Sequence, residues 1–341
     1  MKAMMLREFK RPLEAVELEV PSLGPRDALV RVRACGVCRT DIKIRDGEIP
    51  APIITLPHVP GHEAAGEVVA VGDEVVGWTP GDRVAVYLYV NCGDCKPCLT
   101  GRGNLCPLLR RVGFELQGAF AEYLAVPARQ LLRIGDDMPF EQAAVLTDAV
   151  VVPYHALRNQ AKVGVGDTVL IVGVGGLGIH AVQIARAAGT RVIAADIAED
   201  RLALATELGA DHVIHTLSVD PLAAVRDLTG GFGVDAVVEN VGAPETLAWS
   251  LPALRKGGKL IIVGYTPGRP FPVDSMSMHY NEWEIIGSRL ATKQGLADVI
   301  ELVDRGLVKP WVTRTFPLAE VNEALDELAR DAVLGRAALM V

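Results

Sequence analysis

The six cysteines of the chain fall into two groups whose spacing suits metal chemistry. Cys92, Cys95, Cys98 and Cys106 share one short loop that is rich in glycine. Four thiolates at close spacing satisfy tetrahedral zinc and leave no open position, which is typical of a structural site that crosslinks a loop without its own core. Disulfides and an iron–sulfur cluster are the alternatives. The Cys-Pro pair at Cys106 and Pro107 is typical of an iron–sulfur motif, but the spacing from Cys98 to Cys106 is too long for that motif. We therefore expect structural zinc here.

The remaining pair, Cys35 and Cys38, lies in the stretch ACGVCRTD. An all-cysteine zinc clamp would need two more thiolates, and a redox pair should open a helix in a thioredoxin-like context. One cysteine acting as ligand of a second, open metal site is the better interpretation, with imidazole or carboxylate partners from elsewhere. Candidates for those partners are His58, His62, Glu63, Asp148 and His155.

The stretch GVGGLG carries Gly173, Gly175 and Gly178 in the spacing G-x-G-x-x-G. It follows an expected strand, opens an expected helix and precedes a second strand that ends at Asp196, which is the full context of a dinucleotide-binding fingerprint. A glycine turn needed only for packing is the alternative. Asp196 would accept hydrogen bonds from ribose hydroxyls and repel a 2′-phosphate, so NAD is favoured over NADP. The predicted cofactor contacts also include Gly176, Leu177, Arg201 and Val263.

The composition excludes several other classes of protein. The chain has 341 residues, which favours two domains, and its formal net charge of -8 argues against a nucleic-acid partner. No apolar stretch is long enough to cross a membrane, and the first residues lack the apolar core of a signal peptide. We expect a cytoplasmic protein whose cysteines are thiols or metal ligands.

The pattern of apolar residues changes along the chain, and its two forms predict the elements that position these residues. Short apolar runs broken by glycine and proline fill residues 1–150 and predict an antiparallel, barrel-like domain. Beyond residue 150, strands alternate with helices, which is typical of a parallel sheet with helices on both faces. The expected elements there are 168–172, 177–188, 191–195, 201–208, 211–214, 235–238 and 259–263.

From about residue 287 the pattern is mixed again. Helices are expected near 296–303 and 320–329, and a final strand over 337–341. A strand over 274–284, ending near Trp283, is expected to pair across a subunit interface. We predict one domain from 1–150 and 288–341, and a doubly wound cofactor domain over 151–287.

These motifs together resemble the zinc-dependent medium-chain alcohol dehydrogenase family, nearly end to end. The likeness rests on CGVCRTD, GHEAAGEVVAVG, the four-cysteine loop, the Asp148 segment and GVGGLG with Asp196. It implies a GroES-like catalytic domain joined to a Rossmann domain. It also implies that Cys38, His62 and Asp148 are catalytic zinc ligands and that Cys35 is a packed neighbour. The third family ligand is commonly cysteine, but zinc also takes carboxylate oxygen.

The resemblance implies roles for further side chains. Glu63 corresponds to a glutamate close to the metal, Thr40 to the hydroxyl that contacts the substrate oxygen, and Asp41 to the carboxylate that orients the histidine ligand. Arg39 and Arg336 resemble contacts of the cofactor pyrophosphate. Lys43 departs from the family, because many relatives have a histidine there at the end of a proton relay. Water, the cofactor ribose or a lysine of lowered pKa could serve instead.

The resemblance therefore implies reversible hydride transfer between an alcohol and NAD, with two zinc ions per chain. Alternatives are a polyol or amino-alcohol dehydrogenase of the same family, a zinc-free quinone or enoyl reductase on the same fold, or a non-catalytic protein that binds NAD or metal. A few apolar side chains either line the substrate pocket or are ordinary structural residues, and an apolar pocket would suit a medium or aromatic alcohol. Those side chains are Ile49, Tyr87, Leu88, Tyr89 and Leu290. The resemblance also implies a homo-oligomer, a tetramer or a dimer.

Overall fold

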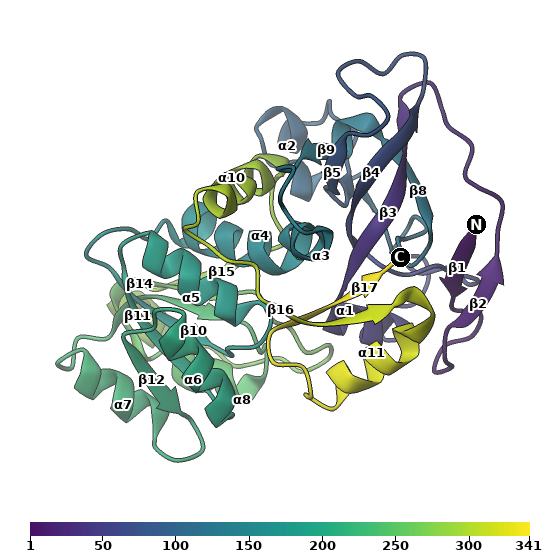
Figure 1. Ribbon diagram of the computed structural model, residues 1–341. Coiled ribbons are helices and arrows are strands. Elements are labelled where there is room, and N and C mark those ends of the chain that lie inside the picture. Colours follow the sequence, from purple (N-terminus) through teal and green to yellow (C-terminus); the bar gives the residue numbers. More distant parts are fainter. The chain divides into compact units, whose positions relative to one another are not determined.

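The computed structural model describes all residues, 1–341, and the chain divides into two compact units (Figure 1). The first comprises Met1–Asp148, Thr292–Asp304 and Pro310–Val341. The second comprises Ala149–Ala291 and Arg305–Lys309. The structure thus groups residues 149–150, 288–291 and 305–309 with the second unit, whereas the division predicted from sequence places them in the first.

The first unit is built on a seven-stranded sheet around the long strand β3 (Asp27–Val37). Strand β3 pairs antiparallel with β17, β4 and β8, and every second side chain along its first half, including Val30 and Val32, is buried. This is the antiparallel β domain predicted for the first region. The other strands are β4 (Glu63–Val71), β5 (Arg83–Val86), β8 (Tyr123–Pro127), β9 (Leu131–Arg133), β16 (Val312–Pro317) and β17 (Arg336–Met340).

Two small two-stranded sheets and several helices complete the first unit. The two-stranded pairs are β1 (Lys2–Met5) with β2 (Glu14–Glu17), and β6 (Tyr89–Val90) with β7 (Arg110–Arg111). The helices are α1 (Arg39–Arg45), α2 (Lys96–Leu99), α3 (Phe140–Val145), α10 (Lys293–Asp304) and α11 (Val321–Ala329). A π-helix, η3 (Leu146–Val150), directly follows α3.

The second unit contains a six-stranded, all-parallel sheet in the order β12-β11-β10-β13-β14-β15. Its strands are β10 (Thr168–Val172), β11 (Arg191–Asp196), β12 (His212–His215), β13 (Val234–Glu239), β14 (Leu254–Ile262) and β15 (Glu284–Gly287). The strand order reverses at β10, which pairs with both β11 and β13, so the loop after β10 lies where Rossmann folds bind their ligands.

The helices of the second unit connect these strands in the predicted alternation. They are α4 (Val151–Tyr154), the π-helix η4 (His155–Ala161), α5 (Gly178–Ala187), α6 (Glu199–Glu207), α7 (Pro221–Leu228), α8 (Pro244–Ser250) and α9 (Ser275–Asn281). The core of the unit consists of β-branched and leucine side chains of the sheet and the helices, with Leu170, Ile193 and Val237 fully buried.

The strand predicted over 274–284 is wrong, because this segment forms helix α9 and only then the edge strand β15. Asp274 caps the helix: its carboxylate accepts hydrogen bonds from the backbone N–H groups of Met276 and Ser277. An N-terminal cap accepts hydrogen bonds from backbone N–H groups that would otherwise have no partner at the start of the helix. No helix anywhere in the structure combines the length and the apolar character that crossing a membrane requires.

Candidate active site

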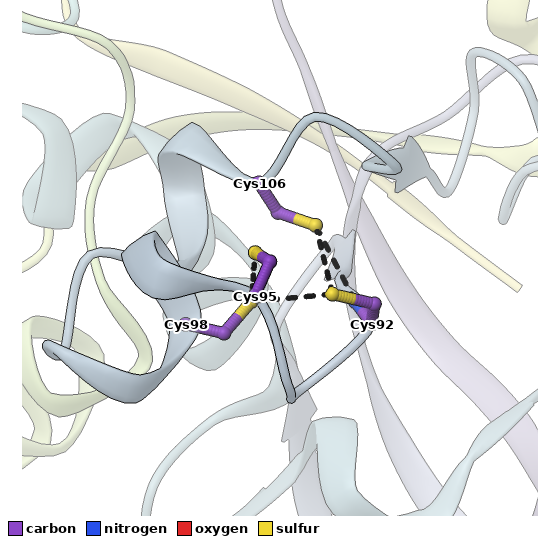
Figure 2. Close-up of side chains that lie close together, drawn as sticks. All are labelled: Cys92, Cys95, Cys98 and Cys106. Carbon is purple, nitrogen blue, oxygen red and sulfur yellow. Dashed lines mark hydrogen bonds between the residues drawn. The ribbon is translucent and has the colours of Figure 1, made fainter.

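The four-cysteine loop brings its sulfur atoms together (Figure 2). The Sγ–Sγ distances are 3.4 Å between Cys95 and Cys98, 3.5 Å between Cys92 and Cys106, and 3.9 Å between Cys92 and Cys98. Zinc–sulfur bonds of about 2.3 Å in a tetrahedron place the sulfurs about 3.8 Å apart. The four thiols are all free of disulfides, so their number and spacing fit one closed zinc site.

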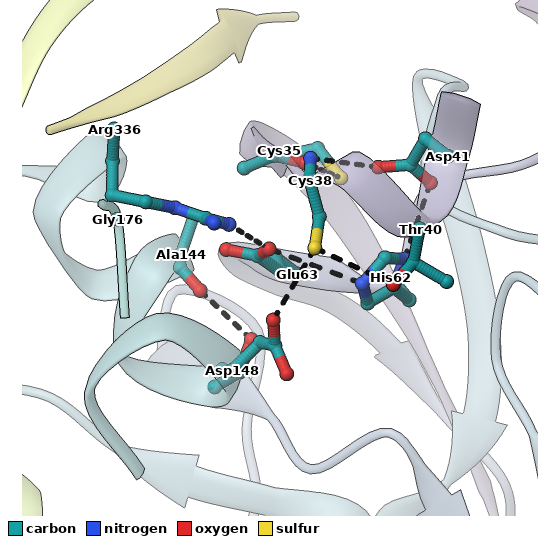
Figure 3. Close-up of polar contacts among 12 residues, drawn as sticks. Cys35, Cys38, Thr40, Asp41, His62, Glu63, Ala144, Asp148, Gly176 and Arg336 are labelled. Carbon is teal, nitrogen blue, oxygen red and sulfur yellow. Dashed lines mark hydrogen bonds and ion pairs between the residues drawn. The ribbon is translucent and has the colours of Figure 1, made fainter. Parts of the chain in front are cut away.

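A second cluster lies in the first unit (Figure 3). The candidate ligand atoms of Cys38, His62, Glu63 and Asp148 all lie within 4.8 Å of one another, and all four residues are buried. The Sγ of Cys38 is 3.7 Å from Oδ2 of Asp148. Thiolate, imidazole and carboxylate are a zinc-binding donor set of the kind found in catalytic sites, so these residues fit a second zinc ion.

The first of these candidate ligands lies at the start of helix α1. Cys38 is its N-cap, and the Asp41 carboxylate accepts a hydrogen bond of 2.9 Å from the Cys38 backbone N–H. The other oxygen of Asp41 lies 3.2 Å from Nδ1 of His62. Asp41 is 1% exposed, so one buried carboxylate positions both the segment that carries Cys38 and the imidazole of His62.

His62 sits between a glycine and the first residue of β4. Gly61 has φ of +97°, and an added Cβ there would lie 2.7 Å from the backbone nitrogen of Phe120, so only glycine fits. The ring of Phe114 packs 5.3 Å from the imidazole. Burial lowers the pKa of His62, but the Asp41 carboxylate and Cys38 raise it to well above its ordinary value. Zinc requires the neutral ring at Nε2, so zinc and a proton compete for this nitrogen.

Glu63 is fully buried and forms an ion pair with Arg336, the first residue of β17. Its Oε1 lies 3.9 Å from Nε2 of His62, while Oε2 has no hydrogen-bond partner. Burial raises the pKa of Glu63 to about 7, and the Arg336 guanidinium opposes that shift. Gly36 leaves room for this carboxylate, because an added Cβ would lie 2.3 Å from Oε2. The sequence predicted Glu63 near the metal but not this pairing.

Asp148 reaches the cluster from the π-helix η3. A π-helix widens the turn by one residue and is frequent at functional sites, because it rotates the following side chains relative to the preceding α-helix. Asp148 is 8% exposed and is the only acidic residue of η3. The altered turn thus places one carboxylate against Cys38.

Three cysteine or histidine candidates lie outside the cluster. Cys35 is fully buried in β3, where burial, and secondarily the charge of Asp41, raises the pKa of its thiol well above the ordinary value. His58 contacts the backbone oxygen of Gly113 at 3.0 Å. His155 lies in η4, near the side chains of its own helix. The metal group that the structure brings together contains none of these three.

Thr40 and Lys43 follow Cys38 on α1 and lie three residues apart, which places them on one face of the helix. The Thr40 hydroxyl oxygen is 3.6 Å from Sγ of Cys38. Burial lowers the pKa of Lys43, against the opposing charges of Glu48 and Cys38. Arg39 is exposed and forms an ion pair with Asp331.

The glycine loop follows β10 in the second unit. Gly173 has φ of +80°, and an added Cβ on Gly178 would lie 2.0 Å from the Gly173 oxygen, so backbone geometry explains these two glycines. An added Cβ on Gly175 would meet no protein atom within 4 Å. Packing within the protein therefore does not require glycine at 175, whereas close approach of a pyrophosphate does.

Asp196 ends β11 beside this loop and is 6% exposed. One carboxylate oxygen accepts a hydrogen bond of 2.6 Å from the Val174 N–H, and the other accepts from the N–H groups of Ile197 and Ala198. The Arg201 guanidinium lies 3.8 Å from the Asp196 carboxylate. A cation is therefore present near where a 2′-phosphate would bind, but it is already paired with the negative charge of Asp196. The loop, the helix start and the carboxylate fit a dinucleotide.

The other expected contacts lie in different places. Val263 directly follows β14, and its N–H donates to the backbone oxygen of Glu239. Tyr87, Leu88 and Tyr89 are buried in the first unit, at no more than 4% exposure. Ile49 and Leu290 are half-buried. The role of these residues in substrate binding stays a prediction.

Comparisons with known proteins match both units. Residues 24–136 match the alcohol dehydrogenase GroES-like domain, and residues 176–305 match the zinc-binding dehydrogenase domain. An NAD-dependent alcohol dehydrogenase of Sulfolobus acidocaldarius is 38% identical over 348 residues, covering 100% of both chains. An alcohol dehydrogenase of Geobacillus stearothermophilus is 36% identical over 340 residues, covering 99% of this chain and 98% of that protein.

The fold agrees with the sequence matches. A crystal structure of an NAD-dependent alcohol dehydrogenase superposes with a TM-score of 0.95 at 33% identity, covering 100% of both chains. The two domain matches, the full-length relatives and this superposition all point to one family, as the motifs predicted. The chain belongs to the zinc-dependent medium-chain alcohol dehydrogenase family.

Proposed function

We propose that this protein is an NAD-dependent zinc alcohol dehydrogenase that oxidises an alcohol to an aldehyde or ketone and catalyses the reverse reduction. The observation that carries the proposal is the buried convergence of Cys38, His62, Glu63 and Asp148 within 4.8 Å, in a chain of this family. The relatives named NAD-dependent alcohol dehydrogenase and the fitting dinucleotide loop support NAD as the acceptor.

Cys38, His62 and Asp148 would hold the catalytic zinc, which leaves one position open for the substrate oxygen. When bound, zinc supplies a Lewis acid that lowers the pKa of an alcohol hydroxyl, and NAD supplies the hydride acceptor. Asp41 keeps the proton of His62 on Nδ1, so that Nε2 faces the ion. Glu63 is close enough to approach the same ion, while Arg336 holds it back.

The chain's own hydroxyl and amine would carry the substrate proton away. Thr40 lies beside Cys38 and would accept the proton through its hydroxyl oxygen. Lys43 lies one turn further along the same face of α1, and burial lowers the pKa of its amine. We propose that Lys43 takes the place of the relay histidine that many relatives have there.

On the cofactor side, Asp196 would accept hydrogen bonds from the adenosine ribose and disfavour a 2′-phosphate. Arg39 and Arg336 stay proposed contacts of the pyrophosphate. Arg336 is buried and engaged with Glu63, but its Nε has no partner within the protein. Arg39 already pairs with Asp331, so a contact with phosphate would exchange one anionic partner for another.

The experiment combines metal analysis with an absorbance assay for NADH. The purified protein should contain two zinc ions per chain and form NADH with members of a panel of alcohols, polyols and amino alcohols. Cys38→Ser should lose one zinc and turnover, while Cys35→Ser should keep both, because Cys35 lies outside the cluster. One zinc and no turnover in the unmodified protein would refute the proposal.

The same panel separates the remaining alternatives. Activity confined to polyols or amino alcohols would assign the narrower substrate class within the family. Reduction of quinones or enoyl thioesters by metal-free protein would identify the zinc-free reductase. NADP in place of NAD in each assay would test the preference attributed to Asp196.

We further propose that the protein is a cytoplasmic homo-oligomer. Six free thiols, four of them gathered in one loop, suit a reducing compartment. Strand β15 is the last strand of its sheet, and the neighbouring helix α9 exposes Met276 and Tyr280 at 64% and 70%. An open sheet edge beside exposed apolar side chains suits pairing with a second copy. Light scattering after size exclusion should give a dimer or a tetramer, and a monomer would contradict this.

A further inference from the structure

The polar backbone groups of the glycine loop divide into two sets. Several are held by the protein: Asp196 accepts from the Val174 N–H, the Asn240 side-chain nitrogen donates to the Gly173 oxygen at 3.2 Å, and His180 contacts the Gly176 oxygen. The N–H groups of Gly175, Gly176 and Leu177 donate no hydrogen bond within the protein. Side chains thus hold two carbonyls of the loop, and three of its N–H groups have no partner within the protein.

His180 provides the most unusual of these contacts. It lies in the first turn of α5, is fully buried, and its Nδ1 is 2.7 Å from the Gly176 oxygen. Its own backbone N–H bonds to the Leu177 oxygen at 3.1 Å, one residue short of the α-helical partner. The Gly176 oxygen therefore loses its regular helical donor, and the imidazole replaces it. Because a carbonyl only accepts, Nδ1 must carry the proton.

When the orientation of the Gly176 oxygen is fixed, the orientation of the Leu177 N–H is fixed as well. The peptide bond between Gly176 and Leu177 is trans, since the chain's cis bonds lie elsewhere. In a planar trans peptide the carbonyl and the following N–H point in opposite directions. An oxygen directed along the helix toward His180 therefore directs the Leu177 N–H away from the helix, beyond its N-terminus, where a phosphate binds.

We propose that His180 is a positioning residue for the dinucleotide: its Nδ1–H holds the Gly176 carbonyl and thereby aims the Leu177 N–H at the pyrophosphate. The inference rests on the proposed use of this loop for NAD. It assigns His180 no contact with the cofactor. It explains why an imidazole, rather than an aliphatic side chain, is buried at this point of a helix whose neighbouring residues Ile179 and Val182 are apolar.

A purely structural role makes a different prediction. An apolar side chain of similar size would fill the same space, but it would leave the Gly176 oxygen without its imidazole donor and free to turn. Packing loss weakens the fold as a whole, whereas loss of the hydrogen bond weakens phosphate recognition in particular. The two roles therefore separate in ligands that share the adenosine but differ in the pyrophosphate.

The test uses the full-length zinc-loaded protein and three variants. His180→Phe keeps an apolar ring without the donor, and His180→Asn keeps a side-chain N–H at the position of Nδ1. Thr190→Val is the matched control, because the Thr190 hydroxyl donates to the Ala185 oxygen at 2.9 Å near the opposite end of α5 and is also buried. Binding of NADH is measured by fluorescence, and ADP-ribose and adenosine are measured as competitors.

His180→Phe should weaken NADH and ADP-ribose about tenfold, the loss expected for one misdirected hydrogen bond to a charged group, and leave adenosine within about twofold. Its KM for NAD should rise while kcat at saturating NAD stays close to that of the wild type. His180→Asn should restore binding, and Thr190→Val should not change it.

Equal weakening of adenosine and ADP-ribose, or no rescue by His180→Asn, would overturn the inference. If His180→Phe does not fold, His180→Asn against Thr190→Val still decides it, because an asparagine variant that folds yet binds ADP-ribose tenfold more weakly contradicts the proposed donor. Wild-type protein that binds no NADH would instead refute the proposed function itself.

Discussion

Replacing Asp41 with asparagine should weaken zinc binding at the proposed catalytic site while leaving the affinity of the four-cysteine site unchanged. The buried carboxylate accepts from the Cys38 N–H at 2.9 Å and faces Nδ1 of His62 at 3.2 Å. With zinc on Nε2, His62 carries its proton on Nδ1, so Asp41 must accept two hydrogen bonds. Asparagine offers one acceptor oxygen, and its NH2 group would then face one of these two donors.

The magnitude follows from what is lost. One charge-assisted hydrogen bond is worth about 1.5–3 kcal/mol, and one buried donor is left unpaired. Loss of such a partner of a zinc-bound histidine typically lowers metal affinity about 10–100-fold, which corresponds to about 1.4–2.8 kcal/mol. We therefore expect Asp41→Asn to bind its catalytic zinc 10–100-fold more weakly, and to need added zinc for activity.

The assay is competition for zinc with a chromogenic chelator, which resolves one tight and one weakened ion per chain, together with kcat measured in zinc buffers. Asp82→Asn is the control, because the half-buried Asp82 also accepts from a backbone N–H, that of Thr79 at 2.8 Å, but lies outside the cluster. Wild-type affinity for both ions in Asp41→Asn would refute this prediction. Release of the ion from the four-cysteine loop instead would refute it as well.

Three further predictions concern the other parts of the molecule. Cys95→Ser should lose one zinc and about 3 kcal/mol or more of unfolding free energy, since the loop has no core of its own, and denaturant titration with metal analysis measures both. Lys43→His should move the acid limb of the pH profile of alcohol oxidation to lower pH, because an imidazole becomes a neutral proton acceptor at lower pH than an amine does. If the acid limb does not move, Lys43 is not part of the proton relay. Asp196→Asn should raise the NADP-to-NAD ratio of kcat/KM about tenfold or more. The substitution removes one negative charge beside the 2′-phosphate and leaves Arg201, which lies 3.8 Å from Asp196, without its carboxylate partner. An unchanged ratio would show that other residues discriminate between NAD and NADP.

The parts of the site that the sequence predicted are those encoded in contiguous segments. The four cysteines of the loop are neighbours in the chain, so spacing alone brings their sulfurs together. The glycine loop likewise depends on one strand, one turn and one helix, and the predicted elements 168–172 and 177–188 lie within a residue or so of β10 and α5. The strand expected over 274–284 was wrong because a short run with apolar residues fits either period, and the cap by Asp274 decides for the helix.

The pairing of Glu63 with Arg336 shows what local patterns do not contain. In the sheet, Gly36 of β3 is opposite Glu63, and the next residue, Val37, is opposite Ala337 on the other side. Arg336 and Glu63 therefore flank the same end of β3, although most of the chain separates them in sequence. Strand order and register create this neighbourhood, and a one-residue slip would turn the side chains to opposite faces. Periodicity within each strand is the same in either register.

The same limit applies to Asp148 and His180, whose positions depend on departures from regular helical hydrogen bonding. The π-helix η3 sets the direction of Asp148, and the shifted bond from the His180 N–H to Leu177 leaves the Gly176 oxygen to the imidazole. Helix propensity reports whether a segment is helical, but not which carbonyl each N–H selects. In this chain, these local shifts direct one proposed metal ligand and one proposed phosphate donor, so the final geometry of both sites depends on hydrogen bonds that the order of residues does not reveal.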